Sequence, residues 1–561
     1  MLTAAPVRVK RKGTAPFSGA AESAILQYMR SASRGTLLLA LAVLALASGC
    51  GKEKGRAPAP DTSAAGPALG RVIVIGFDGL EPSLVRKWAA QGKLPNFQRV
   101  LDAGAFGPLL SVVPPSSAPA WTSAVTGVNP GKHGIYGFLA TPIPGLQSEA
   151  QQGAAAEPVF ATSSNRGFEA VWDVIGRSGR RSTLINIPLT SPADSLNGLM
   201  ISGFPHASDP GAPSYWPPEA ARYLGDYVFD SFGVDVVRGR EWEMISEIEA
   251  NSAKRLTLGF TLFDKADWDL FWLVFTFTDV YQHYLWKFMD RDHPMYDDEG
   301  GRLYGDAIEA GYKMADAYLG GFIERMRDSD LLVIMSDHGF GPAYYIINSR
   351  NFLLRTLGPV PEVACTDFFS IKFSITTSGP DADEKASSLR NALRSGLAGL
   401  KDPDRGTSIV DSVYTKEQLY KGPYLSLAPS VIGVEAGNYL FFTLPRTPDL
   451  RIFDTGPAPD KMFSGFHRRR GTLGLYGRYV KPGQAVDARI TDIAPIIYAY
   501  LGVPAPAEMD GRVPIQAFRD EIATQLSLRR SQDQGYRKPR NLASQDAKAI
   551  EKQLRSIGYI Q

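Results

Sequence analysis

The fold is decided by Val72-Ile73-Val74-Ile75-Gly76-Phe77-Asp78-Gly79, a continuous apolar run that ends in a carboxylate and a glycine. Such a run predicts a strand buried on both faces of a sheet. Two further runs follow the same plan: 270–277 precedes Asp279, and 331–335 precedes Ser336-Asp337-His338-Gly339. Helical patterns at 82–90, 241–262 and 305–327 separate them. This alternation predicts an α/β fold with a mainly parallel central sheet flanked by helices, in which ligands bind at the carboxyl ends of the strands.

Six acidic and imidazole side chains near these predicted strand ends are candidate metal ligands. The set is Asp78, Asp279, His283, Asp337, His338 and His467. Oxygen and imidazole ligands suit Zn²⁺, Mn²⁺ or iron, and six ligands divide into two sites of three. Two neighbouring ions can clamp the attacking and leaving oxygens of a displacement at phosphorus. Taken singly, each residue also has a structural explanation, such as a turn at Asp78 or a solvated helix face at 279–283.

The candidate nucleophile is a hydroxyl side chain in the segment 114–127, which follows a strand-like run at 107–113. Three hydroxyls compete for the role: Ser116, Ser117 and Thr122. The positive end of a helix favours an incoming anion, and metal coordination can activate a serine hydroxyl. The alternative explanation is a serine that only caps a helix. The remaining histidines, His133, His206 and His293, are interpreted as structural.

The order of these residues resembles the alkaline phosphatase superfamily, and within it the type I phosphodiesterase/nucleotide pyrophosphatase family with its bacterial predicted phosphohydrolases. The resemblance covers about 71–520 and is carried by the stretches 74–79, 119–134, 336–340 and 510–512. It implies a three-layer sandwich like that of alkaline phosphatase for a catalytic domain at 71–525. We interpret 341–460, which is rich in Gly, Pro, Ser and Thr, as a cap inserted into that domain.

The resemblance also implies a role for each candidate residue. Ser117 corresponds to the hydroxyl nucleophile. Asp279, His283 and His467 would hold one ion, and Asp78, Asp337 and His338 the other, with zinc as the usual metal. The implied reaction is the hydrolysis of a small phosphate ester or nucleotide in two steps. Ser117 forms a covalent phospho-enzyme or nucleotidyl-enzyme, and water activated at the metal pair then releases it.

One departure from the superfamily argues against sulfatase activity, because Trp121 stands where a sulfatase motif requires arginine. No arginine stands beside Ser117 in the sequence to bind two charged oxygens of a monoester. This favours diesters, although Lys132 or Asn186 could supply such contacts. Two alternatives stay open: a phosphomonoesterase or phospho-group transferase that acts on envelope lipid or glycan, and a non-catalytic binding protein.

Composition and charge exclude several other classes of protein. The chain has 561 residues, of which 44% are hydrophobic and 21% charged, so global disorder is excluded. Two cysteines, Cys50 and Cys365, exclude a disulfide scaffold. The net charge is +2, but it is unevenly distributed: residues 1–50 and 526–561 are basic, and the residues between them carry an excess of acidic side chains. An acidic body is a poor binder of nucleic-acid polymers, which need a basic surface.

The first 50 residues have the features of a secretion leader. The apolar run 36–47 has the length of a signal-peptide core, follows Arg30 and Arg34, and ends in Ala47-Ser48-Gly49-Cys50. This ending resembles a bacterial lipobox, in which Cys50 would carry the lipid. Met29 is an alternative start, and an ordinary secretory signal or a single anchor helix is the alternative explanation. We expect a flexible linker at 51–70 and a basic tail at 526–561 that forms either a peripheral helix or a loose segment. We also expect attachment to the bacterial cell envelope, facing the periplasm or exterior.

The lipidation hypothesis predicts that Cys50→Ser releases the protein from membranes, because the acylated residue is lost. Fractionation of cells that express the full chain would measure this. Retention of the variant in the membrane fraction would indicate an uncleaved apolar helix instead.

Overall fold

A computed structural model describes residues 66–139, 160–206, 213–229, 239–367, 369–444, 449, 452–454 and 463–539. The predicted leader, Cys50 and all but the last residues of the predicted linker lie outside these ranges. Within them, no helix combines the length and the apolar composition that a membrane-spanning segment needs.

The centre of the fold is a ten-stranded sheet in the order β18-β2-β17-β7-β1-β6-β3-β4-β5, with β19 also paired to β2. β1 (Val72–Phe77) lies in the middle, where it pairs in parallel with β6 (Leu270–Phe275) and β7 (Leu331–Met335). The other strands are β2 (Ala105–Leu110), β3 (Ser182–Ile185), β4 (Gly198–Ile201), β5 (Tyr215–Trp216), β17 (Arg470–Tyr476), β18 (Gln484–Ala485) and β19 (Ala488–Arg489). Only β17 and β5 run antiparallel to their described neighbours.

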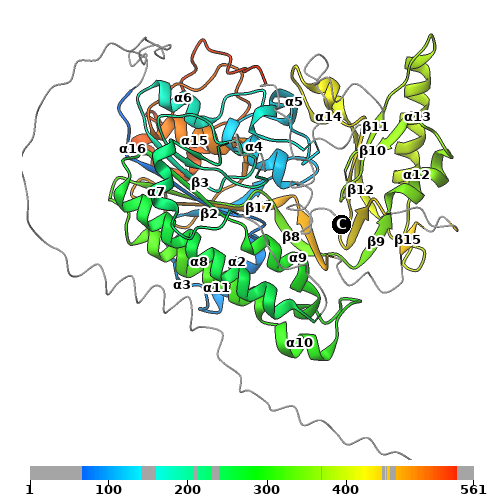
Figure 1. The fold of residues 1–561 in the computed structure, drawn as a ribbon, viewed down its shortest axis with the longest axis horizontal. Helices are drawn as coiled ribbons and strands as arrows, with labels where there is room; N and C mark the ends of the chain where they lie inside the picture. Colours follow the sequence, from blue (N-terminus) through cyan, green and yellow to red (C-terminus); the bar gives the residue numbers. More distant parts are fainter. Residues whose placement is uncertain are drawn as a thin grey trace, which may run out of the picture. The chain divides into compact units, whose positions relative to one another are not determined.

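Helices cover both faces of this sheet (Figure 1). One layer contains α2 (Pro82–Ala90), α3 (Pro95–Ala103), α8 (Glu241–Lys265) and α11 (Ala307–Ile323), and the other contains α4 (Ser117–Thr126), α6 (Val171–Arg177) and α15 (Ile493–Tyr500). Alternate strand residues face each layer, as the strand period requires. Val72 and Val74 belong to the core beneath α4, α6 and α15, whereas Phe77 packs on Phe97 of α3. The predicted α/β fold with a mainly parallel sheet flanked by helices is confirmed.

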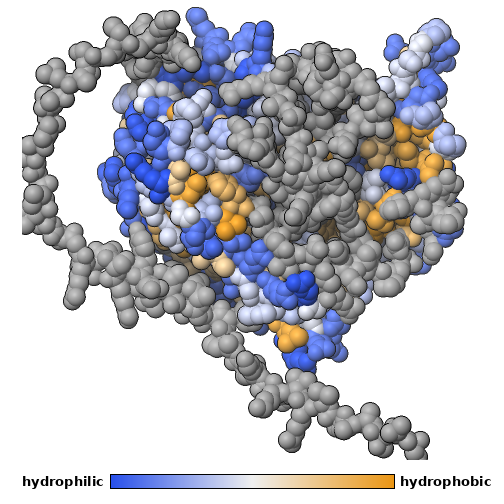
Figure 2. Space-filling view, in the orientation of Figure 1, coloured by the Kyte–Doolittle hydropathy of each residue, from blue (hydrophilic) through white to orange (hydrophobic). Residues whose placement is uncertain are grey.

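The segment predicted as a cap builds two smaller sheets. The first has the order β10-β11-β13-β12 and the second the order β14-β9-β15. Their strands are β9 (Tyr345–Asn348), β10 (Val363–Cys365), β11 (Lys372–Ile375), β12 (Val410–Thr415), β13 (Val431–Glu435), β14 (Tyr439–Phe442) and β15 (Phe453–Asp454). Helices α12 (Ser349–Leu357) and α13 (Ala382–Ala398) share with them a core of their own. In Figure 2 the surface of α13 is mostly hydrophilic, with apolar residues beside it over the cap strands.

The cap is joined to the body of the fold by hydrogen bonds as well as by the chain. Tyr420 OH donates to the carbonyl oxygen of Val113, and Lys372 Nζ to that of Tyr136. Tyr136 and Tyr420 also belong to a common apolar cluster. These contacts connect the cap to the segments just before and after α4.

The first part of the predicted basic tail, 526–539, packs on the body. Leu526 is buried, and Glu169 N–H donates to Gly535 O. Arg537 reaches a buried ion pair between Arg166 and Asp194, with its Nη1 3.6 Å from Asp194 Oδ1. The expected boundary at 525 therefore differs from the structure, because apolar and ionic contacts anchor the residues that follow it.

The pair of Arg166 and Asp194 predicts a strong, pH-dependent contribution to stability. Burial alone would raise the pKa of Asp194, but Arg166 and Arg537 lower it below its ordinary value. We expect Asp194→Asn to lower the free energy of unfolding by about 3–5 kcal/mol, because the buried Arg166 loses its closest counter-charge and keeps only Asp173, at 3.9 Å. The loss should be complete above the unfolded-state pKa of about 3.9 and fade as the pH falls through the lowered native value.

Urea titrations at several pH values would measure this effect, with Asp533→Asn as the control. Asp533 pairs with Arg177 at 3.0 Å, but both side chains are about half exposed. The control should cost less than about 1 kcal/mol. Equal losses in both variants would contradict the importance of the buried pair.

Candidate active site

Three carboxylates meet where the central parallel strands end. β1 leads directly into Asp78, whose backbone N–H donates to Phe275 O at the end of β6. Gly79, with φ of 67°, turns the chain, and its N–H donates to Asp337 Oδ1 at 3.2 Å. Asp337 follows β7, and Asp279 lies in the first turn of the helix after β6. All three carboxylates are buried.

The helix α9 (Phe277–Met289) supplies two of the candidate ligands. Asp279 and His283 are four residues apart, and His283 Nε2 lies 3.4 Å from Asp279 Oδ2. The start of this helix is tied to the chain after β1, because Thr278 Oγ1 donates to Asp78 O and Gln282 Nε2 to Gly79 O. The helix thus begins right after β6 and presents Asp279 and His283 on one face.

The remaining two histidines come from a small two-stranded ribbon. β8 (Gly339–Pro342) begins just after His338, and β16 (Gly465–Arg468) carries His467. The rings of His338 and His467 stack with their centroids 3.6 Å apart. His467 Nε2 lies 3.3 Å from Asp279 Oδ1 and 3.1 Å from His283 Nε2. The ribbon thus brings together ligands that are 129 positions apart in the sequence.

Backbone carbonyl groups fix the orientation of all three histidine rings. Nδ1 of His283 lies 2.9 Å from Gly465 O, Nδ1 of His338 3.1 Å from Gly339 O, and Nδ1 of His467 3.0 Å from Pro115 O. A carbonyl oxygen only accepts, so each Nδ1 carries the proton. Burial lowers the pKa of His338 to about 4 and also lowers that of His467, so both rings are neutral at pH 7. Each Nε2 then has a lone pair directed toward the carboxylates, which is the arrangement of a metal-ligating histidine.

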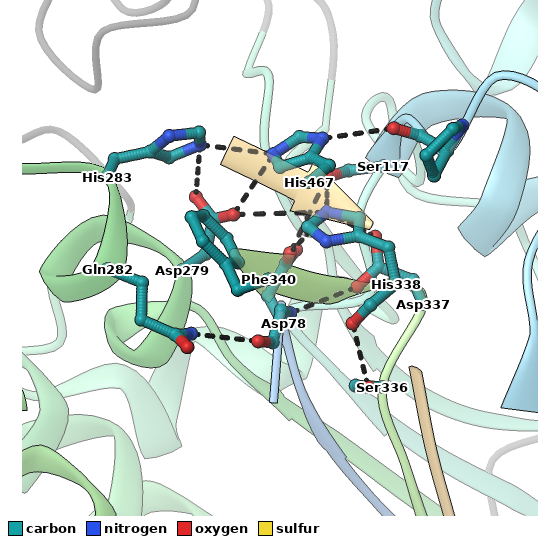
Figure 3. A network of polar contacts seen from close by, with 12 residues as sticks. Asp78, Ser117, Asp279, Gln282, His283, Ser336, Asp337, His338, Phe340 and His467 are labelled. Carbon is teal, nitrogen blue, oxygen red and sulfur yellow. Dashed lines mark hydrogen bonds and ion pairs between the residues drawn. The ribbon is translucent and has the colours of Figure 1, made fainter. Parts of the chain in front are cut away.

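The described residues contain two groups of three ligand atoms close enough to hold a metal ion. One group is Asp279, His283 and His467, and the other is Asp78, Asp279 and His338 (Figure 3). Asp279 belongs to both groups, and Asp337 Oδ2 lies 3.3 Å from His338 Nε2 beside the second one. The buried atoms Asp279 Oδ1 and Asp337 Oδ2 have no hydrogen-bond partner. Divalent cations fit this donor set, because they would neutralise the carboxylates and satisfy both oxygens.

The pKa values of the carboxyl groups indicate that a positive charge would stabilise this cluster. Burial, together with the charge of Asp279, raises the pKa of Asp337 to about 7. Burial and the neighbouring Asp337 and Asp279 also raise the pKa of Asp78 well above its ordinary value. Burial alone would raise the pKa of Asp279, but the neighbouring His283 lowers it below its ordinary range. Without a cation, the site can keep its carboxylates ionised only at a cost.

Ser117 is the hydroxyl that contacts this cluster. It is the first residue of α4, and its Oγ lies 3.3 Å from His338 Nε2 and 3.5 Å from Asp78 Oδ1. Thr122, a competing candidate, donates its hydroxyl to Ala118 O within the same helix. Ser116, the third candidate, is the N-cap residue of α4, and its side chain makes no capping hydrogen bond.

The residues expected as structural or auxiliary have contacts outside the two ligand groups. His133 bonds to Ser123 Oγ, His206 lies 3.4 Å from Ser202 Oγ, and His293 lies against the carbonyl groups of Ala343 and Ser464. Lys132 is held by Asp510 and Glu508, and the Asn186 amide donates to Val274 O.

Sequence reasoning missed a residue that the structure adds to the site. Trp121 Nε1 donates to Asp78 Oδ2 at 3.0 Å. Its spacing of four residues from Ser117 was the available signal, because it puts both residues on one face of a helix.

Solved structures resemble this chain distantly. Human ectonucleotide pyrophosphatase/phosphodiesterase 5 is 15% identical with a TM-score of 0.48, over 80% of this chain and 100% of that one. Phosphonoacetate hydrolase from Sinorhizobium meliloti is 16% identical with a TM-score of 0.48, over 77% of this chain and 95% of that one. No curated protein sequence matches the chain. Because both TM-scores are below 0.5, the assignment rests on the family model.

That model, type I phosphodiesterase / nucleotide pyrophosphatase, matches residues 72–457, which is more than half of the chain. The matched range contains every candidate ligand except His467, together with Ser117. The chain therefore belongs to the type I phosphodiesterase / nucleotide pyrophosphatase family, and it is a hydrolase of phosphoester bonds.

Proposed function

We propose that this protein is a metal-dependent phosphodiesterase or nucleotide pyrophosphatase that works through a covalent intermediate on Ser117. The observation that carries the proposal is the position of Ser117 Oγ, 3.3 Å from His338 Nε2 and 3.5 Å from Asp78 Oδ1. A serine hydroxyl is a weak nucleophile unless a base or a metal ion activates it. Because Ser117 Oγ contacts two candidate metal ligands, activation by a metal ion is the favoured explanation.

Two ions, most simply Zn²⁺, would be held by the two halves of the cluster. One half is Asp279, His283 and His467, and the other is Asp78, Asp337 and His338, with Asp279 close to both. Bound there, the ions would lower the pKa of the serine hydroxyl and of water and would stabilise charge on the phosphoryl oxygens.

Ser117 Oγ would form a bond to phosphorus while the ester bond to the leaving group breaks. The start of α4 at Ser117 supports binding of the anionic substrate, because the positive end of the helix dipole lies there. Water would then hydrolyse the phosphoester of Ser117 and restore its hydroxyl. The neutral rings of His338 and His467, fixed through Nδ1, would keep the ligand atoms in place throughout both steps.

The substrate would be a small phosphate ester or nucleotide, handled at the cell envelope if the leader carries a lipid on Cys50. The cap reaches the histidine side of the cluster through a group of phenylalanines. Phe463 stacks on His283 with centroids 3.9 Å apart, and Phe369 of the cap lies 5.0 Å from Phe463. Differences in the cap would therefore alter the surroundings of His283.

Ser117→Ala should abolish hydrolysis of bis-p-nitrophenyl phosphate by zinc-loaded protein. We expect a loss of roughly 10³-fold or more in kcat, because the covalent step loses its nucleophile. Steady-state kinetics of residues 70–561 would measure the loss.

Ser116→Ala is the matched control, because it removes the adjacent hydroxyl, and it should keep most of the activity. Equal activity of Ser117→Ala and wild type would contradict the covalent mechanism. Wild-type turnover of p-nitrophenyl phosphate alone would favour the monoesterase alternative.

The shared position of Asp279 predicts different metal losses for two ligand variants. Wild type should bind about two ions per chain, and His283→Ala should lose one of them. Asp279→Asn should weaken both, because its carboxylate belongs to both ligand groups. Elemental analysis of dialysed protein would measure the bound metal. An Asp279→Asn variant that keeps one ion as tightly as wild type does would contradict the shared role.

A further inference from the structure

Trp121 is a fully buried residue of α4 that touches Asp78 directly. Its indole Nε1–H donates to Asp78 Oδ2 at 3.0 Å. An indole N–H only donates, so Oδ2 is occupied as an acceptor. The other carboxylate oxygen, Oδ1, is the one that lies 3.5 Å from Ser117 Oγ and 3.4 Å from His338 Nε2. The hydrogen bond thus decides which oxygen of Asp78 is turned toward the cluster.

The spacing of Trp121 and Ser117 couples this orientation to the nucleophile. The two residues are four apart in α4 and therefore lie on one face of the helix, one turn from each other. Each contacts a different oxygen of the same carboxylate. The N-terminal part of α4 is consequently fixed to Asp78 at two points one turn apart, and the position of Ser117 relative to Asp78 depends on both.

Gly76 in β1 provides the space that this arrangement requires. A Cβ atom at position 76 would lie 2.6 Å from Trp121 Cη2 and 3.0 Å from Val274 Cγ2. Real Cβ atoms essentially never approach other atoms so closely. The absence of a side chain at Gly76 lets the indole lie over the end of the strand that carries Asp78.

We propose that Trp121 is a positioning residue for the reaction: through its N–H it orients Asp78 for metal binding and places Ser117 against it. The roles of Asp78 and Ser117 in this inference rest on the proposed function. Trp121 itself is buried below the carboxylate and acts through it, without contact to the reacting phosphorus.

The test is Trp121→Phe in the full catalytic chain, which keeps an aromatic ring but removes the donor. We expect kcat for bis-p-nitrophenyl phosphate to fall roughly 10–100-fold, as for other groups that orient metal ligands, with a much smaller change in KM. We also expect Zn²⁺ affinity to fall by a similar factor at one of the two sites, because Asp78 belongs to only one ligand group. Competition with a chromophoric chelator measures this second readout without any substrate.

Trp172→Phe is the matched control. Trp172 is also buried, and its Nε1 donates to another buried carboxylate, Asp194 Oδ2, at 3.2 Å. It should lose comparable packing and one hydrogen bond, yet both zinc affinities and kcat should stay at wild-type values. An equal loss of zinc affinity or kcat in both variants would overturn the proposal, because the effect would then be a general one on packing.

A Trp121→Phe variant with wild-type kcat and two wild-type zinc affinities would also overturn it. If the phenylalanine variant does not fold, 3-benzothienylalanine at position 121 keeps the ring shape and lacks only the N–H, so the same two readouts apply. The zinc measurement is independent of the nucleophile. Full activity of Ser117→Ala would therefore refute the proposed function without affecting the zinc result for Trp121.

Discussion

The repulsion among three buried carboxylates is the constraint on which the rest of this structure depends. Parallel strands bring Asp78, Asp279 and Asp337 to one edge of the sheet, where water is excluded. Burial raises the pKa of Asp337 to about 7. A fold that keeps such a cluster needs positive charge at its centre, and His338 and His467, whose pKa values burial lowers, do not provide it at pH 7. The same repulsion that would destabilise an empty cluster would favour the binding of divalent cations, as we propose.

Hydrogen bonds from the surrounding fold fix the orientation of the candidate ligand side chains. Carbonyl groups hold the three histidines by Nδ1, and the indole of Trp121 holds Asp78 by Oδ2. Backbone N–H of Gly79 holds Asp337 by Oδ1. Each of these bonds leaves a single ligand atom directed inward. The candidate ligands are therefore oriented by donors and acceptors of the fold itself, which is the preorganisation that the proposed reaction would need.

The central sheet could be predicted because it follows from local patterns of apolar residues. The sequence also named the six Asp and His side chains as candidate metal ligands, and that role stays a prediction. The apolar runs before Asp78 and Asp337 form strands that pair in parallel. Their carboxyl ends therefore lie side by side. The contact of His467 with Asp279 was inferred from the family resemblance, since nothing local links residues 188 positions apart. The packing of 526–539 on the body was missed, because a polar, basic composition hides single anchors such as Leu526 and Arg537.

The bond from Trp121 to Asp78 illustrates a kind of contact that pattern reasoning does not reach. A tryptophan in a helix of small residues is usually part of the core, and its ring does pack into the core between the sheet and α4, α6 and α15. Its N–H becomes functional only because Gly76, on a different element, leaves room for the ring above the strand that carries the carboxylate. Trp121 and Gly76, which both have the features of structural residues in the sequence, thus act together to orient Asp78. Such effects depend on close approach between elements, and they become visible only when the three-dimensional arrangement is known.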